Sequence, residues 1–166
     1  MVHPEGPDLP YRWAVGAIAC NREGLVLIGE RLGTPGAWQF PQGGIDEGEA
    51  PLAAAYREFQ EEVGVALTEC WGEYPDWLRY EFPPAVLAST AIGKKYRGQQ
   101  QRWFLLGWPD GTAAACRLDA HDEPEFARVE FVPFAEAVNR VVAFKRPIYE
   151  NLQRFFAPVI ATARYM

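Results

Sequence analysis

The sequence predicts one mixed α/β domain in which a β-sheet lies between helices. The apparent order of elements is strands, one helix, further strands and final helices, which is typical of a layered α/β fold. The 166 residues are 49% hydrophobic and 23% charged, as expected of a globular chain. No internal repeat or linker divides the sequence. We therefore expect residues 11–166 to form a single domain, preceded by a flexible arm in the Pro- and Gly-rich residues 1–10.

A β-hairpin is the first predicted element. WAVGAIAC (13–20) and LVLIGER (25–31) are apolar runs on either side of the turn-like sequence NREG. The sequence TPGAW (34–38) indicates a second turn. WQFPQGG (38–44) then leads into a helix.

The helix is predicted over residues 51–63. Pro51 suits its first turn, and Gly64 suits the position just past its end. At about 100° per residue, one apolar stripe faces the core. Its members are Leu52, Tyr56, Phe59 and Val63.

The remaining elements follow from apolar runs and prolines. ALTEC (66–70) and WGEYPDWLRYEFP (71–83) predict strand segments broken by proline, and QQRWFLLGW (100–108) predicts a buried strand. VEFVPF (129–134) is a further strand. Apolar residues at helical spacing predict C-terminal helices over 134–144 and 146–166, with Pro147 near a helix start.

Charge and cysteine content limit the class of protein. A net charge of -6 disfavours broad nucleic-acid binding, so binding of any polyanion requires a local cationic site on the protein. No membrane-spanning run or signal peptide is visible. The three cysteines, Cys20, Cys70 and Cys116, are far apart and are expected to be buried thiols in a reducing interior. We expect a cytoplasmic protein.

Three glutamates, Glu58, Glu61 and Glu62, share a second face of the predicted helix. Negative charges late in a helix repel one another and oppose the helix dipole. They could form a solvated acidic face. The arrangement is stabilised if a cation neutralises it, and carboxylate oxygens suit Mg²⁺ or Mn²⁺.

The residues from Gly43 to Val65 resemble the signature of the Nudix hydrolases. The matching positions are Gly43, Glu49, Arg57, Glu58, Phe59, Glu61, Glu62, Gly64 and Val65. The resemblance implies an α/β/α sandwich with a mixed sheet. It also implies hydrolysis of a nucleoside diphosphate linked to another group.

The same resemblance assigns roles within the signature. Glu58, Glu61 and Glu62 would bind the metal, with a backbone carbonyl at Gly43 or its neighbour as an additional ligand. Arg57 and Glu49 would fix the signature loop against the helix, although residue type alone allows an ordinary surface ion pair.

Further segments resemble one branch of the family, which contains bacterial RNA pyrophosphohydrolases and plant-type asymmetrical diadenosine tetraphosphate hydrolases. They are WQFPQGGIDEGE, YRGQQQRWFLL, EPEF and VVAFKRPIY. By this resemblance Glu125 would bind a metal or act as general base, Lys145 would hold a phosphate or base edge, and Phe144 would stack on a purine or pack in the core. The residues expected to face or border the substrate cleft are Arg12, Arg31, Gln99, Gln101 and Arg102. Tyr80 is interpreted as an ordinary strand tyrosine.

The favoured function is Mg²⁺-dependent, asymmetrical hydrolysis of diadenosine tetraphosphate to ATP and AMP. One alternative is removal of pyrophosphate from triphosphorylated RNA ends. RNA-acting relatives can carry a second arginine where this chain has Leu32, which favours the dinucleotide. Other possibilities are a nucleotide-sensing module without activity and an enzyme that clears damaged triphosphates. The expected partners are therefore a dinucleoside polyphosphate or an RNA 5′ end, and no membrane.

Overall fold

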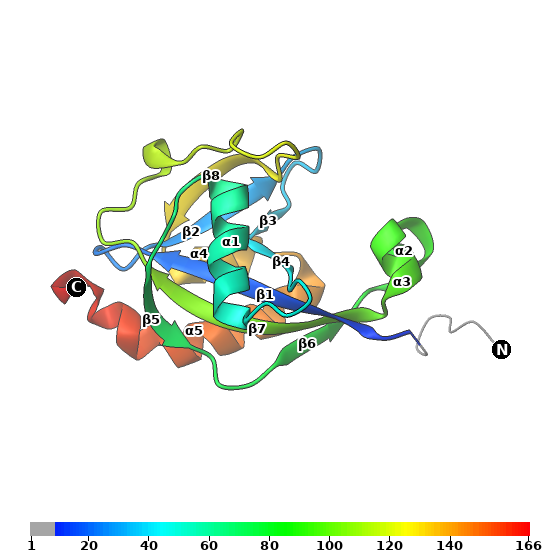
Figure 1. The fold of residues 1–166 in the computed structure, drawn as a ribbon. Coiled ribbons are helices and arrows are strands. Elements are labelled where there is room, and N and C mark those ends of the chain that lie inside the picture. Colours follow the sequence, from blue (N-terminus) through cyan, green and yellow to red (C-terminus); the bar gives the residue numbers. More distant parts are fainter. Residues whose placement is uncertain (1–8) are drawn as a thin grey trace.

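A computed structural model describes residues 9–166 and shows one mixed sheet between two helical layers (Figure 1). Within this range, eight strands form the sheet: β1 (Tyr11–Cys20), β2 (Val26–Arg31), β3 (Trp38–Gln39), β4 (Gln42–Gly44), β5 (Glu69–Glu73), β6 (Leu78–Glu81), β7 (Gly98–Gly107) and β8 (Phe126–Val132).

The centre of the sheet is the parallel pair β1 and β7. Their register runs from Tyr11 opposite Gly98 to Cys20 opposite Gly107. The main path is β3-β2-β1-β7-β5, while β4 pairs with β1, β6 with β7 and β8 with β2. All these other pairs are antiparallel. The prediction of a mixed sheet is confirmed.

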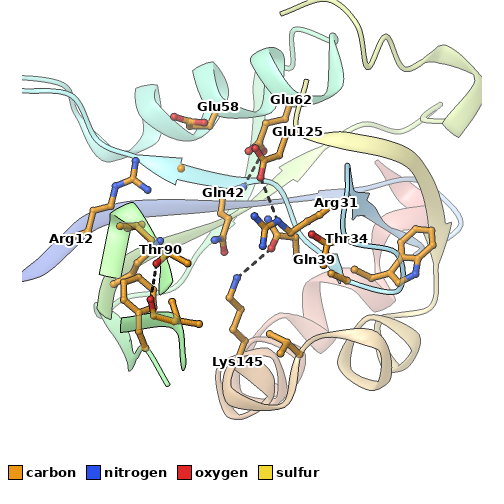
Figure 2. Close-up of a pocket in the computed structure, with 18 of the residues that line it drawn as sticks. Arg12, Arg31, Thr34, Gln39, Gln42, Glu58, Glu62, Thr90, Glu125 and Lys145 are labelled. Atoms are coloured by element: carbon orange, nitrogen blue, oxygen red, sulfur yellow. Dashed lines mark hydrogen bonds and ion pairs between the residues drawn. The ribbon is translucent and has the colours of Figure 1, made fainter. Parts of the chain in front are cut away.

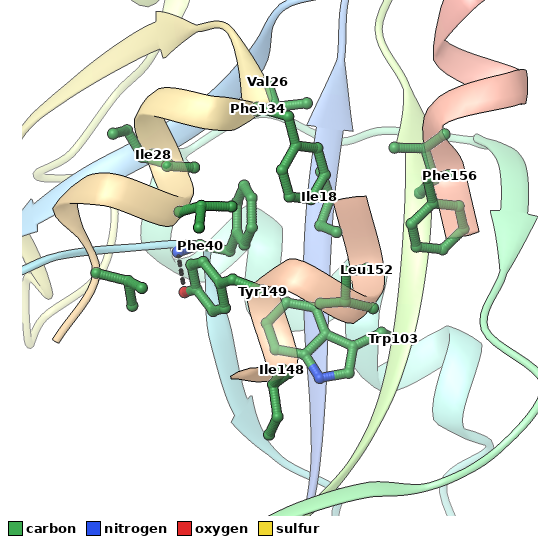
Figure 3. Close-up of a cluster of buried hydrophobic side chains, with 14 of the residues drawn as sticks. Ile18, Val26, Ile28, Phe40, Trp103, Phe134, Ile148, Tyr149, Leu152 and Phe156 are labelled. Carbon is green, nitrogen blue, oxygen red and sulfur yellow. Dashed lines mark hydrogen bonds between the residues drawn. The ribbon is translucent and has the colours of Figure 1, made fainter. Parts of the chain in front are cut away.

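Helix α1 (Pro51–Val63) covers one face of the sheet, and α4 (Phe134–Arg140) and α5 (Arg146–Ala161) cover the other (Figure 1). Each face has its own apolar cluster. On the α4 and α5 side, Phe40, Trp103 and Tyr149 pack together (Figure 3). The Tyr149 hydroxyl accepts a 2.8 Å hydrogen bond from the amide of Phe40. The structure is thus the expected α/β/α sandwich.

Local sequence explains the position of α1. Pro51 lies in the first turn, and Gly64 ends the helix in the left-handed conformation with φ 76°. This conformation favours glycine because a side chain would be strained. In the apolar stripe, Phe59 and Val63 are fully buried, whereas Leu52 and Tyr56 are partly buried. The predicted helix is confirmed.

The main departures are short elements. WQFPQGG forms the two short strands β3 and β4 before it reaches α1. Residues between β6 and β7 form two short helices that the pattern did not predict, α2 (Pro84–Ser89) and α3 (Ala91–Lys95). Short 3₁₀ turns occur at Ala113–Ala115, Ala143–Lys145 and Ala163–Tyr165.

The cysteine prediction is partly wrong. Cys20 is buried, but Cys116 is half-buried and Cys70 is exposed. Cys70 lies on β5, the end strand of the main path, where little chain covers it. All three are free thiols.

The predicted arm falls mostly on residues 1–8, which lie outside the described residues. Its last two residues are in place: Leu9 is buried, and the carbonyl of Pro10 accepts a hydrogen bond from Arg97. None of the helices formed by residues 9–166 is long and apolar enough to cross a membrane.

Candidate active site

A cleft of about 610 Å³ opens between α1 and the 3₁₀ turn that precedes α5 (Figure 2). The glutamate face of α1 forms one wall. The opposite wall comes from the 3₁₀ turn Ala143–Lys145, and α2 and α3 close one end. The cleft therefore joins segments from the whole length of the chain.

Glu62 is the most enclosed carboxylate of the first wall. It is only 8% exposed, and its Oε2 accepts a 3.0 Å hydrogen bond from the backbone amide of Gln42. Burial, and then the negative charges of Glu58 and Glu125, hold the pKa of Glu62 well above its ordinary value. Its ionised form is thus destabilised unless positive charge lies nearby.

Arg57 joins the signature loop to α1. Its guanidinium donates two hydrogen bonds to Glu49, of 2.8 and 2.9 Å, and a third of 2.9 Å to the carbonyl of Gly44. Hydrogen bonding to Arg57 is the main cause that lowers the pKa of Glu49. Both side chains are largely covered, so this geometry is that of a loop clamp rather than of a loose surface pair.

Arg57 also contacts two of the predicted metal ligands. Its Nη1 lies 2.9 Å from Glu58 Oε1 and 3.3 Å from Glu61 Oε2. Within residues 9–166, no three acidic, histidine or cysteine side chains converge as a ready-made metal site. The contacts to Arg57 give the physical reason, because they direct these two carboxylates toward the guanidinium.

The donor set nevertheless fits a hard divalent cation. Glu58, Glu61 and Glu62 line one wall, and Glu125 lines the same cleft. A side chain at Gly43 would clash with the Glu58 carboxyl, so only glycine lets backbone and carboxylate approach so closely. Burial raises the pKa of Glu58, against the lowering effect of Arg57. Crowded carboxylates with raised pKa values are stabilised by a bound cation.

The opposite wall is cationic and aromatic. Lys145 is 8% exposed, and its Nζ donates a 3.3 Å hydrogen bond to Gln39. The ammonium lies 5.6 Å from the ring centre of Tyr80 and 5.9 Å from that of Phe144. Burial, followed by the charge of Arg31, lowers the pKa of Lys145 to about 8.

Arg31 and Arg12 border the cleft at two places (Figure 2). The Nε of Arg31 lies 3.7 Å from Glu125, in an ion pair whose two side chains are about half exposed. The guanidinium of Arg12 lies close against Gly44, beside the signature loop. Both cations are placed to contact an anion in the cleft.

Most predicted substrate residues lie around this cleft, but two do not line it. Gln99 lines it, whereas Gln101 is buried beneath and donates to Gln42 and Gln99 at 3.2 Å each. Arg102 belongs to the other face of the sheet, where it pairs with Glu73. The prediction that Arg102 borders the cleft is therefore wrong, because neighbouring positions on a strand point to opposite faces.

The structure adds residues that the sequence analysis left out of the site, among them Tyr80, which was interpreted as an ordinary strand tyrosine. Tyr80 lines the cleft, and its ring centre lies 5.5 Å from that of Phe144. Gln39 and Gln42 face the cleft from β3 and β4. The alternation of Tyr80 with exposed neighbours in β6 was the available signal for this tyrosine.

Comparisons with known proteins agree with this geometry. The profile of the NUDIX domain matches residues 10–152. The RNA pyrophosphohydrolase of Acidiphilium cryptum is 48% identical over 90% of this chain and 92% of its own length. Nudix hydrolase 25 of Arabidopsis thaliana is 42% identical, over 88% of this chain and 86% of its own.

Solved structures share the fold at lower identity. A dihydroneopterin triphosphate pyrophosphohydrolase of E. coli superposes with a TM-score of 0.66 at 20% identity, covering 86% of this chain and 96% of the other. A C. elegans Ap4A hydrolase gives a TM-score of 0.61 at 15% identity, covering 87% and 98%.

Proposed function

The chain belongs to the Nudix hydrolase family, and from this premise we propose that it is an RNA pyrophosphohydrolase that removes pyrophosphate from triphosphorylated RNA 5′ ends. Its general chemistry is hydrolysis of phosphoanhydride bonds. The observation that carries the finer proposal is the agreement of several relatives, 48%, 44% and 43% identical over nine-tenths of this chain, that bear this name. These relatives favour the RNA alternative over the dinucleotide reaction that the sequence favoured.

The two walls of the cleft suit a 5′-triphosphate end. Arg31 and Lys145 supply positive charge for phosphate oxygens, and charge-assisted hydrogen bonds of this kind are the stronger ones. The partly exposed ring of Phe144 lies beside the Lys145 ammonium and suits a nucleobase, and the buried ring of Tyr80 packs against it at 5.5 Å between ring centres. The cleft thus has groups suited to both the triphosphate and the base of a terminal nucleotide.

The acidic wall is where water would attack phosphorus. A divalent cation held by Glu58, Glu61, Glu62 and a carbonyl at Gly43 would neutralise the phosphates and acidify the water. Family membership implies such an ion, and we propose Mg²⁺, with Mn²⁺ accepted by the same oxygen donors. We assign Glu125 as the acceptor of the water proton, because it lines the cleft from outside α1 and its own ion pair, with Arg31, is long at 3.7 Å, whereas the three glutamates of α1 are proposed as metal ligands. The reaction is expected in the cytoplasm.

Asymmetrical hydrolysis of diadenosine tetraphosphate is the second candidate. The observation in its favour is Leu32, which is 56% exposed beside Arg31. At this position RNA-acting relatives can carry an arginine that sandwiches an RNA base. The match to an Ap4A hydrolase shows the fold alone at 15% identity.

The test compares the two substrates under identical conditions. Purified protein with Mg²⁺ is given triphosphorylated RNA or diadenosine tetraphosphate, and products are identified by mass spectrometry. We expect pyrophosphate and monophosphorylated RNA at a higher kcat/KM than ATP and AMP. A higher kcat/KM for the dinucleotide would establish the second candidate. Inactivity on both, with metal bound, would support a nucleotide-sensing module.

A further inference from the structure

A second polar and aromatic surface lies on the α1 side of the sheet, beyond the end of the helix. In Figure 1 the N-terminal part of β1, the start of β7 and β6 extend past α1 toward α2 and α3. The side chains of this face come from β1, β6, β7 and the turns beside them. We call it the extension face, and the residues that define it are Tyr11, Trp13, Trp77, Arg79, Arg97 and Arg102.

One of its aromatic rings, that of Trp13, is open to solvent, whereas those of Tyr11 and Trp77 are partly buried. Trp13 is 54% exposed, although tryptophan is usually among the more buried residues. Its ring meets that of Trp77 edge to face, with 4.8 Å between ring centres. The Trp77 contact holds the Trp13 ring in place. A fixed and exposed ring of this kind is a surface on which a base can stack.

Arginines are interleaved with these rings. Arg79 and Arg97 lie 5.0 and 4.9 Å from the ring centre of Tyr11, and Arg102 lies 5.6 Å from that of Trp77. Arg97 pairs with Glu81, and Arg102 with Glu73.

The extension face therefore has more arginines than paired carboxylates. Arg79 has no ion pair among the residues described, so its charge is available to a ligand. In a chain of net charge -6, the three arginines form a local group of positive charges, with Asp46 and Glu58 at the adjoining hollow.

The extension face is continuous with the active site. A hollow of about 320 Å³ is lined by Trp13 at one side and by Glu58 and Asp46 at the other. Arg12 and Glu58 line both this hollow and the main cleft. A strand that leaves the cleft past Arg12 would reach Trp13 without crossing a layer of the fold.

We propose that the extension face binds the single-stranded body of the RNA substrate, downstream of the 5′ end that reacts in the cleft. Bases stack on Trp13, and phosphates contact Arg79 and its neighbours. This combination of π faces and guanidinium groups suits single-stranded nucleic acid without sequence preference. The inference rests on the proposed function, because it assigns a second site to the same substrate.

The experiment measures how catalysis depends on RNA length. Pyrophosphate release is followed for unstructured triphosphorylated RNAs of two and of twelve nucleotides, and the ratio of kcat/KM, long over short, is compared between proteins. In the native protein the ratio should exceed one. Trp13→Ala should lower this ratio by about tenfold, since one stacked base contributes on the order of 1–3 kcal/mol. Trp13→Tyr, which keeps an aromatic ring, should restore most of it.

Tyr165→Ala is the matched control, because Tyr165 is a more exposed aromatic residue at the far C-terminus, at 74%. It should leave the ratio unchanged. Circular dichroism checks that each variant is folded. A ratio near one in the native protein, or an equal ratio in Trp13→Ala, would overturn the extension-face proposal while leaving the proposed function intact.

A second measurement keeps the two proposals separable. Binding of a twelve-nucleotide RNA with a 5′-hydroxyl end is followed by fluorescence anisotropy, so that no reacting phosphate contributes. Native protein should bind it about tenfold more tightly than Trp13→Ala. If the native protein fails to cleave any triphosphorylated RNA, the proposed function is wrong. The binding measurement alone then decides whether the extension face binds single-stranded RNA.

Discussion

The two walls of the cleft differ in how they are built. The acidic wall comes from one helix, whose carboxylates Glu58, Glu61 and Glu62 follow each other within five residues. The opposite wall is assembled from Gln39, Tyr80 and the 3₁₀ turn containing Lys145, which are far apart in sequence. Helical periodicity sets the spacing of the first wall, whereas the second depends on the packing of the whole fold.

The difference also appears in the electrostatics. On the acidic wall, burial raises the pKa of Glu62, which favours its neutral form. On the opposite wall, burial lowers the pKa of Lys145 to about 8, which also favours the neutral form. Each wall is therefore strained by its own desolvated charge. A cation bound as proposed would stabilise the ionised form of the first wall, and a substrate phosphate that of the second, so we expect metal and substrate to bind cooperatively.

The largest effect is expected from neutralising the acidic wall. Glu62→Gln keeps the shape of the side chain but removes its charge, and loss of one electrostatic contact at a reacting centre lowers turnover on the order of 10²- to 10³-fold. Steady-state kinetics with saturating RNA and Mg²⁺ measures kcat. Glu69→Gln on the exposed end of β5 is the control and should keep the native kcat. A native kcat in Glu62→Gln would refute the metal assignment.

A smaller effect is expected on the cationic wall. Lys145→Met removes the buried ammonium and should raise KM by about 10- to 100-fold, the range for one hydrogen bond to a charged group, with kcat little changed. Since the pKa of Lys145 is about 8, the native KM should rise between pH 7 and pH 9 as the ammonium loses its proton.

The variant should lack that rise in KM. Arg154→Met, an exposed cation on α5, is the control and should behave as native protein. If Lys145→Met showed the same KM and the same pH dependence as native protein, the cationic wall would have no part in holding the substrate.

The smallest effect concerns stability without divalent cations. Because the pKa of Glu62 is raised in the folded state, its contribution to stability is present below about pH 4.5 and is lost as pH rises through the folded pKa. In the presence of a chelator, the free energy of unfolding of the native protein should therefore fall by about 1.4 kcal/mol for each pH unit of increase across that range, relative to that of Glu62→Gln. Urea unfolding at several pH values measures this difference.

Adding Mg²⁺ to native protein and to Glu62→Gln tests the metal assignment without any measurement of activity. Mg²⁺ should raise the Tm of native protein, because an ion that binds only the folded state stabilises it. The rise in Tm should be much smaller in Glu62→Gln. Equal Tm shifts in the two proteins would place the ion elsewhere.

The arginines show where prediction from sequence reached its limit. Arg57 lies beside Glu49, as the resemblance to the family signature implied, whereas residue type alone had left an ordinary surface ion pair open. Arg102 was assigned to the cleft but lies on the other face, next to Trp77. The face of a strand residue depends on register, and register is fixed by partner strands that the local sequence does not reveal.

Tyr80 and Cys70 show the same limit. Both lie in segments whose local pattern predicted a strand, and both segments are strands. The side chain of Tyr80 is buried in the cleft wall because the 3₁₀ turn Ala143–Lys145 packs against it, whereas Cys70 is exposed at the end strand of the main path. Strand propensity is a local property, but burial depends on what covers the strand.

The sequence by itself determined α1, its two ends and the common face of its glutamates, because helical geometry relates residues only a few positions apart. Only the tertiary structure decided that Lys145 faces those glutamates, and that an exposed tryptophan lines a hollow next to the same site. Such contacts join distant segments of chain, and their positions follow from how the layers pack around the sheet.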